Sequence, residues 1–329
     1  MSTHFDPVPL VGTGVDPVAD IEDWLASPPV RALVEAFART DQDHELARDL
    51  AARKGDAAER LARLDVFTRR WDTRRGRERN LADDLPVRPE LQQLVRAAAE
   101  ALGLCGGTRL RYGHYEHVLV LGGLIRACLA RTAYAAHLIR TGRVTAGSVT
   151  ALGGHRPFVG DEFELAALAG APELGEEYEA LDFGTRRAFG LQTPESVTGE
   201  ESELPGGTWA VRTYRTPGRL PVRVVAAPSS RPERRRADTA DSYAFFAERV
   251  AELEPGDRLL LVTTALHVPA QHATAVRMLQ LPFAVEVDTV GIEPSRAPEP
   301  ARRPSGATAC LLEIRSTVRA LAQLHAALR

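Results

Sequence analysis

Four short aliphatic runs constrain the fold of this chain more than any other feature. They occupy residues 118–121, 148–152, 223–227 and 258–263, and small or polar residues follow each of them. The runs show little alternation of apolar and polar positions, and a helical pattern follows most of them. Strands of a parallel sheet have this pattern because helices cover both of their faces. We therefore predict an α/β fold with a doubly wound, mostly parallel sheet and right-handed crossovers.

The first part of the chain has a different pattern. Apolar residues such as Leu33, Val34 and Phe37 recur there at helical spacing. We predict an N-terminal helical module over residues 1–105 and an α/β domain over residues 106–329. Residues 172–207 are acidic and rich in glycine, and we interpret them as an insertion into the α/β domain.

Composition narrows the function classes. The chain has 329 residues and a formal net charge of -3, so no bulk attraction to nucleic acid or to an acidic membrane is expected. No apolar stretch reaches membrane-spanning length, and the N-terminus lacks a secretion-signal pattern. The three cysteines are scattered, which favours reduced thiols in a cytoplasmic protein. No residue spacing indicates a metal site.

Two glycine pairs are the first candidate binding elements. Gly122 and Gly123 follow the first strand, and Gly153 and Gly154 follow the second. Glycine lets a ligand approach the backbone, and the helix that follows presents free N–H groups to an anion. Arg126 and Arg156 lie just beyond the two pairs, and we expect them to meet anionic groups of the ligand. The alternative is a tight strand–helix turn with no ligand.

The fourth run ends in hydroxyl residues and a histidine. Thr263 and Thr264 end the strand, and His267 follows within one helical turn. Ligands bind at the carboxyl ends of strands in open α/β sheets, so His267 is a candidate acid/base or polar anchor. The alternative is a histidine that caps or packs at a helix start.

Thr239 and Asp241 lie at the start of a predicted helix at about residues 238–253. Arginines precede this helix, and its first turn contains residues suited to N-cap positions. The functional interpretation is ligand binding beside the helix N-terminus. The alternative is a solvated surface loop.

Taken in order, these strand-end motifs resemble the YdcF-like, or DUF218, family over roughly residues 110–329. The matching elements are Leu121-Gly-Gly123, Leu152-Gly-Gly154 followed by Glu162, Asp238-Thr-Ala-Asp-Ser242, and the segment from Thr263 to Gln271. Departures are Asp241-Ser242 in place of Glu-Asn, Thr264 in place of Ser, and Gln271 in place of Arg.

The resemblance implies a Rossmann-like domain and, for one branch of the family, S-adenosylmethionine binding. It also implies that Glu162 and Gln271 belong to the site, Glu162 beside His267 as a candidate catalytic residue. Membrane-anchored branches have envelope roles, which this chain is not expected to share.

We therefore expect a cytoplasmic protein that binds a nucleotide-like or adenosyl metabolite in a cleft at the strand ends. The expected activity is group transfer or hydrolysis on a small molecule, in specialised metabolism. The cofactor would be S-adenosylmethionine or a nucleotide. The alternative is a non-catalytic sensor or interaction protein that uses the helical module to contact a partner.

Overall fold

The computed structural model describes residues 4–76, 82–106, 109–204, 206–292, 297 and 306–329. It divides into two compact units. The first, the helical unit, comprises Met1–Gly107, Ala265–Arg277 and Pro304–Arg329. The second, the α/β unit, comprises Thr108–Thr264 and Met278–Arg303. The domain boundary near residue 105 stays a prediction.

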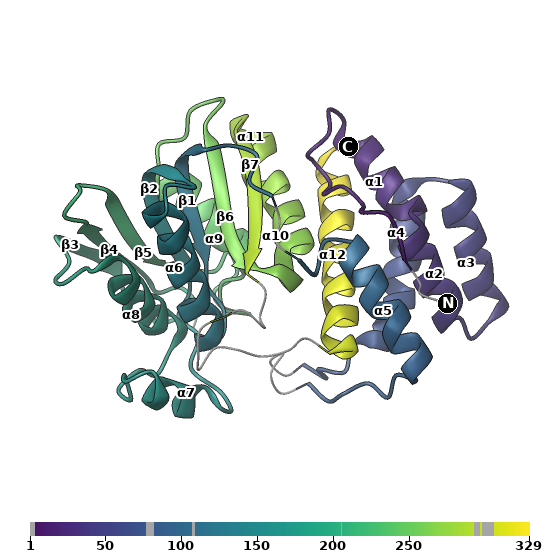
Figure 1. Ribbon diagram of the computed structural model, residues 1–329, viewed down its shortest axis with the longest axis horizontal. Coiled ribbons are helices and arrows are strands. Elements are labelled where there is room, and N and C mark those ends of the chain that lie inside the picture. Colours follow the sequence, from purple (N-terminus) through teal and green to yellow (C-terminus); the bar gives the residue numbers. More distant parts are fainter. Residues whose placement is uncertain (1–3, 77–81, 107–108, 205, 293–296, 298–305) are drawn as a thin grey trace. The chain divides into compact units, whose positions relative to one another are not determined.

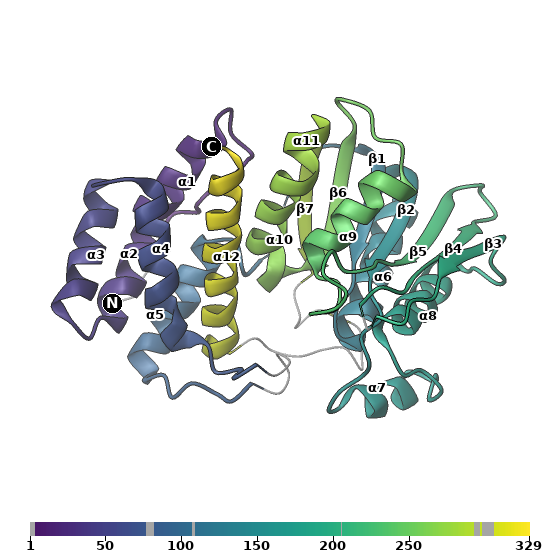
Figure 2. The same cartoon turned by 180° about the vertical axis from the view of Figure 1, so that it is seen from behind.

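The helical unit collects helices from three stretches of the chain. Its elements are α1(Pro17–Ala26), α2(Pro28–Phe37), α3(Asp41–Ala52), α4(Ala57–Thr68), η1(Arg69–Trp71), α5(Pro89–Ala101), η4(Ala265–His267), α10(Val268–Ala275) and α12(Ala307–Ala327). Figures 1 and 2 both show α12 running alongside α4 and α5. Leu311, Val318 and Leu321 of α12 are buried in the same apolar core as the N-terminal helices. The core of this unit is therefore completed by the last helix of the chain.

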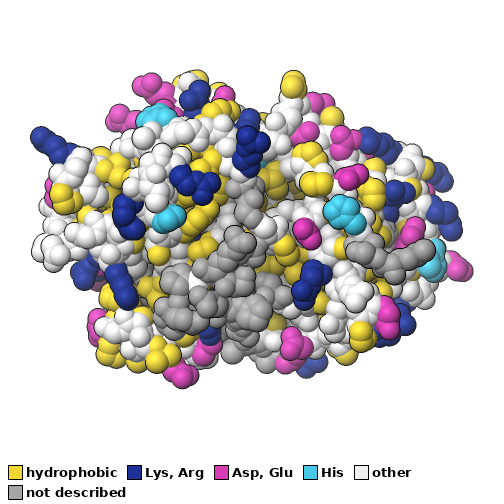
Figure 3. Space-filling view, in the orientation of Figure 1, with side chains coloured by type: hydrophobic (Ala, Val, Ile, Leu, Met, Phe, Trp, Pro, Cys, Tyr) yellow, Lys and Arg dark blue, Asp and Glu magenta, His cyan; other side chains and the backbone are white. Residues whose placement is uncertain are grey.

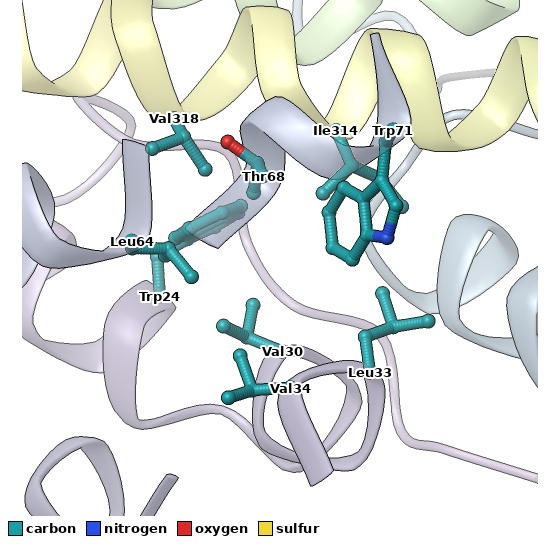
Figure 4. Close-up of a pocket in the computed structure, with 9 residues that line it drawn as sticks. All are labelled: Trp24, Val30, Leu33, Val34, Leu64, Thr68, Trp71, Ile314 and Val318. Carbon is teal, nitrogen blue, oxygen red and sulfur yellow. The ribbon is translucent and has the colours of Figure 1, made fainter. Parts of the chain in front are cut away.

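A small cavity shows how tightly this core is packed. It measures about 10 Å³ and is lined mainly by apolar side chains (Figure 4). The lining residues are Trp24, Val30, Leu33, Val34, Leu64, Thr68, Trp71, Ile314 and Val318. A space of this size holds at most one water molecule, so it is a packing defect and not a ligand pocket.

The α/β unit contains a seven-stranded sheet in the order β3-β4-β5-β2-β1-β6-β7. The strands are β1(His114–Leu121), β2(Thr145–Gly153), β3(Ser196–Glu200), β4(Trp209–Arg215), β5(Pro221–Ala226), β6(Arg258–Thr264) and β7(Glu286–Ile292). The neighbouring strands β5, β2, β1, β6 and β7 pair in parallel. Strand β4 pairs antiparallel with both β3 and β5. The predicted α/β fold with a mostly parallel sheet is therefore confirmed.

Helices cover both faces of this sheet. The covering helices include α6(Ile125–Arg140), α8(Glu177–Phe189) and α9(Thr239–Phe245). The unit also contains α7(Glu162–Leu168), η3(Phe246–Val250) and α11(Leu281–Phe283), and η5(Val276–Gln280) links α10 to α11. Figure 1 shows α6 and α8 in front of β1, β2 and β5, and Figure 2 shows α9 over the opposite face. Because both faces are buried, the strands read as apolar runs without alternation.

The segment 172–207 is not an insertion, contrary to our interpretation of its composition. It supplies α8, whose Leu181 is fully buried, and the edge strand β3.

Among the described helices, none combines the length and the apolar character needed to cross a bilayer.

A reciprocal cap fixes the start of α3 in the helical unit. Thr40 Oγ1 accepts a bond from Asp43 N, while Asp43 Oδ2 accepts bonds from the backbone N–H groups of Arg39 and Thr40. The Arg70 guanidinium donates to both oxygens of Asp43, at 2.9 and 3.0 Å. The bond from Arg70 lowers the pKa of Asp43 from 3.8 to about 2.

Replacing Asp43→Asn should destabilise the helical unit, because Arg70 loses its charged acceptor. We expect a loss of about 1–2 kcal/mol at pH 7, measured by urea unfolding followed by Trp fluorescence. The lowered pKa means that this contribution is present above about pH 4 and lost as the pH falls through about 2. The gap between wild type and Asp43→Asn should therefore close in acid. Asp41→Asn, at an exposed position of the same turn, is the control; an equal loss in both variants would contradict this account.

Candidate functional site

The two predicted glycine turns lie side by side at the carboxyl edge of the sheet. Leu121 of β1 is in register with Leu152 of β2, and Gly122 N donates to Leu152 O at 2.7 Å. Gly123 has φ +153°, a backbone conformation that residues other than glycine rarely adopt. The structure therefore brings the two turns together, as the pattern of strands and glycines predicts.

A buried carboxylate explains why Gly122 and Gly153 have no side chain. A Cβ at Gly122 would overlap with Glu177 Oε1. A Cβ at Gly153 would lie 2.8 Å from the same oxygen and 2.5 Å from Leu181 Cδ1. At Gly154, by contrast, the nearest atom to such a Cβ would be 3.5 Å away, which is ordinary contact. Glu177, the first residue of α8, therefore lies directly against both turns.

Arg156 joins two carboxylates beneath these turns. Its Nη1 and Nη2 bond the two oxygens of Glu162 at 2.7 and 2.8 Å, and its Nε bonds Glu177 Oε2 at 3.0 Å. Arg156 and Glu162 are 4% and 1% exposed, so the network is almost dry. A buried arginine is suited to such a network because its planar guanidinium can donate two parallel hydrogen bonds to the two oxygens of one carboxylate.

Glu162 also accepts a hydrogen bond from the first backbone N–H of α6. Its Oε1 accepts a bond from Ile125 N at 2.8 Å, and its Oε2 accepts one from Val159 N at 3.0 Å. The helix N-terminus that we expected to hold an anion of the ligand therefore already holds a carboxylate of the chain. The catalytic role of Glu162 stays a prediction.

Glu177 differs from Glu162 in having one oxygen left over. Its Oε2 is bonded by Arg156, whereas its Oε1 accepts no hydrogen bond from the described residues. The side chain is 10% exposed. Burial raises the pKa of Glu177, and the nearby Arg156 opposes that rise. This residue is thus a buried, polar group with unused acceptor capacity beside the glycine turns.

Arg131 links the ends of β1 and β6 within the α/β unit. Its Nε donates to Thr264 Oγ1 at 3.0 Å, and its Nη1 donates to Leu121 O at 2.7 Å and to Gly122 O. The side chain of Arg131 is 1% exposed. Thr264 is therefore held at the same edge as the first glycine turn, as predicted.

Three of the other predicted ligand contacts of the α/β unit, Arg126, Thr263 and Asp241, have partners within the chain. Arg126 forms an ion pair with Asp161, and Thr263 is fully buried in β6. Thr239 begins α9, where Asp241 takes part in a capping box and pairs with Arg235. These residues stay predicted ligand contacts, but their present bonds are those of local structure.

His267 and Gln271 belong to the helical unit, whereas the glycine turns belong to the α/β unit. The Nδ1 of His267 lies 3.0 Å from Glu313 Oε2 of α12, and Glu313 is 3% exposed. A buried carboxylate at this distance contributes to the orientation of the imidazole ring. This contact could not be predicted, because the two residues are far apart in the chain.

Sequence reasoning missed two residues of this edge, Arg131 and Glu177. Arg131 lies inside a predicted helix, and Glu177 lies in the segment that we interpreted as an insertion. The only available signal for Glu177 was its place at the start of a helical pattern, where acidic residues are common for reasons of helix stability alone.

Metal ions and nucleic acid are two further ligand classes. In those ranges, no group of three or more His, Cys, Asp or Glu side chains is placed to hold a metal ion. Figure 3 shows basic and acidic side chains interspersed over the drawn face of the helical unit. The expectation that nucleic acid is not a partner stays a prediction.

Comparison with known proteins identifies the family. A model of the Rv3785 N-terminal domain matches residues 12–103. The uncharacterized protein Rv3785 of Mycobacterium tuberculosis (strain ATCC 25618 / H37Rv) is 30% identical over 319 residues, which cover 88% of each chain. The uncharacterized protein Mb3814 of Mycobacterium bovis matches equally well. This chain belongs to the Rv3785 family. No solved structure matches it significantly.

The expected membership of the YdcF-like family is therefore wrong. The reason is visible at Gly122 and Gly153. Packing against Glu177 requires glycine at both positions, so Leu-Gly-Gly after a buried strand reflects a close contact in this fold. Such motifs do not identify one family.

Replacing Gly153→Ala should lower the thermal midpoint of the protein strongly, because the new methyl group would meet Leu181 and Glu177. We expect a destabilisation of about 1–3 kcal/mol, as for other overpacked cores. Gly154→Ala is the matched control, with an expected change of less than about 0.5 kcal/mol. Differential scanning calorimetry measures both. Equal midpoints for the two variants would show that Glu177 does not lie against the turn.

Proposed function

We propose that this is a cytoplasmic protein whose α/β unit binds a nucleotide-like or adenosyl metabolite at the carboxyl ends of β1 and β2. S-adenosylmethionine or a nucleotide is the proposed cofactor. The observation that carries this proposal is the pair of adjacent glycine turns with the buried, partly unsatisfied carboxylate of Glu177 against them. The three cysteines are free thiols, in keeping with a cytoplasmic setting.

The order of the strands supports the position of the site. From β1 the sheet grows through β2 to β5 on one side, and then through β6 to β7 on the other. Open α/β sheets bind ligands outside the carboxyl ends of the strands where the direction of growth reverses. That point lies at β1, next to Gly122 and Thr264. The same order of parallel strands occurs in doubly wound dinucleotide-binding sheets, so we propose a Rossmann-like description of this unit.

Group transfer or hydrolysis is the activity we propose. Its support is His267 of the helical unit, whose Nδ1 lies against the buried Glu313 carboxylate. His267 is the proposed general base or polar anchor. No step of the reaction is assigned to other residues.

A second candidate is a non-catalytic sensor of the same ligand. One observation favours it: Arg126, Arg156 and Glu162 are engaged with carboxylates or backbone groups of the chain itself. The variant His267→Ala separates the two candidates. If the wild type turns over a substrate and the variant does not, while both bind the ligand equally well, the protein is an enzyme. If the variant keeps the ligand affinity of the wild type and the wild type itself shows no turnover, the protein is a sensor.

Thermal-shift measurements on the full chain test the binding proposal. S-adenosylmethionine, S-adenosylhomocysteine, adenosine and adenine nucleotides are the probes. A ligand at about 100 times its Kd stabilises the folded state by about 2.7 kcal/mol, which raises Tm by about 4 °C for a protein of this size. Hydrogen exchange with and without the best probe should show protection at residues 119–125 and 150–156. Absence of a response to every adenosyl compound and nucleotide would refute the proposal.

A further inference from the structure

We infer that the site at the glycine turns takes a ligand without phosphate, and that Glu177 Oε1 accepts hydrogen bonds from vicinal hydroxyls such as those of a ribose. This inference rests on the proposed function and narrows it. It favours adenosine-like and adenosyl-sulfur compounds over nucleotides.

The first argument is that the anion position at the start of α6 is occupied. A phosphate at such a turn would bind the free N–H groups of the helix N-terminus. Here Ile125 N donates to Glu162 Oε1 at 2.8 Å, and Arg156 holds both oxygens of that carboxylate. A phosphate would have to displace a carboxylate that is 1% exposed and satisfied by four hydrogen bonds.

The second argument is electrostatic. The network places two carboxylates, Glu162 and Glu177, around the guanidinium of Arg156. The second guanidinium at these turns, Arg131, is already bonded to Leu121 O, Gly122 O and Thr264 Oγ1. Arg126, the arginine in the first turn of α6, is paired with Asp161. A phosphate beside the glycine turns would therefore bring further negative charge next to buried carboxylates. In a site shielded from water such like-charge contacts are strongly unfavourable.

The third argument is the unused oxygen of Glu177. An ionised carboxylate only accepts hydrogen bonds, so its natural partner is a donor. Oε1 lies against Gly122 and Gly153, accepts no bond from the described residues, and belongs to a side chain that is 10% exposed. Arg156 fixes the other oxygen, so the carboxylate is held in place before a ligand arrives.

A ribose diol fits this acceptor. Its two hydroxyls are donors without charge, and a carboxylate near the end of the second strand is a known way to bind them in dinucleotide-binding sheets. A neighbouring sulfonium cation is also compatible with an edge that contains two carboxylates. The chemistry of Glu177 therefore selects the adenosyl class among the ligands proposed above.

Isothermal titration of the full chain with adenosine, 2′-deoxyadenosine and adenosine 5′-monophosphate tests this inference. The wild type should bind adenosine at least about tenfold more tightly than either analogue, the loss expected for a hydrogen bond to a charged group. The variant Glu177→Gln should lose about tenfold in affinity for adenosine, and its preference over 2′-deoxyadenosine should disappear. Its affinity for the monophosphate should fall less than its affinity for adenosine, because removal of one negative charge offsets part of the lost hydrogen bond.

Glu173→Gln is the matched control, because it removes the same charge from an exposed position four residues earlier. It should leave all three affinities unchanged. Circular dichroism and Tm establish that each variant is folded. If Glu177→Gln does not fold, the preference of the wild type for adenosine over its 2′-deoxy and 5′-phosphate analogues carries the test.

The possible failures are distinct. If the wild type binds the monophosphate as tightly as adenosine, or if Glu177→Gln keeps the 2′-hydroxyl preference, this inference is wrong while nucleotide binding stands. If no adenosyl compound or nucleotide binds at millimolar concentration, the proposed function itself fails, and this inference fails with it.

Discussion

The ion network of Arg156, Glu162 and Glu177 is the interaction on which the carboxyl edge of the sheet depends. It connects the turn after β2 to the start of α7, through Glu162, and to the start of α8, through Glu177. It reaches the start of α6 as well, because Arg156 Nη2 donates to Gly123 O at 3.0 Å. Buried charges are tolerated only when they are paired, so loss of one member leaves another uncompensated. The network therefore fixes three helices relative to two strands.

The same network determines which polar groups this edge leaves available for the ligand that we propose. A glycine turn before a helix ordinarily offers its backbone N–H groups to a phosphate. In this chain a carboxylate of the protein takes that place, and the glycines are needed to make room for Glu177. The polar group that remains available is an acceptor. The mostly parallel α/β sheet thus ends in glycine turns whose anion position is filled by the chain itself.

The main features of the α/β unit could be predicted from the sequence. Unbroken apolar runs indicate strands buried on both faces, and the glycine pairs after β1 and β2 lie together because neighbouring parallel strands end at the same edge. Arg131 and Glu177 could not be found in this way. Whether an acidic residue at a helix start faces water or a glycine turn depends on contacts between distant segments, and the composition of residues 172–207 gives no sign of them.

The surroundings of His267 could not be predicted from the sequence. The position of this residue after β6 follows from the apolar run that precedes it, but its neighbour Glu313 comes from α12, which packs into the core of the helical unit. The amphipathic pattern of a helix indicates that one face is buried, but not against which unit. The family resemblance failed for a related reason, since short motifs imposed by packing recur in unrelated sheets.

Ligand binding against the two glycine turns beside Glu177 is tested most directly by a 1H–15N NMR spectrum of the protein labelled at glycine, titrated with S-adenosylhomocysteine. We expect saturable shifts at Gly122, Gly123, Gly153 and Gly154, with no change at a distant glycine such as Gly55 of the helical unit. Unchanged signals from the four glycines at a saturating ligand concentration would contradict the proposed binding.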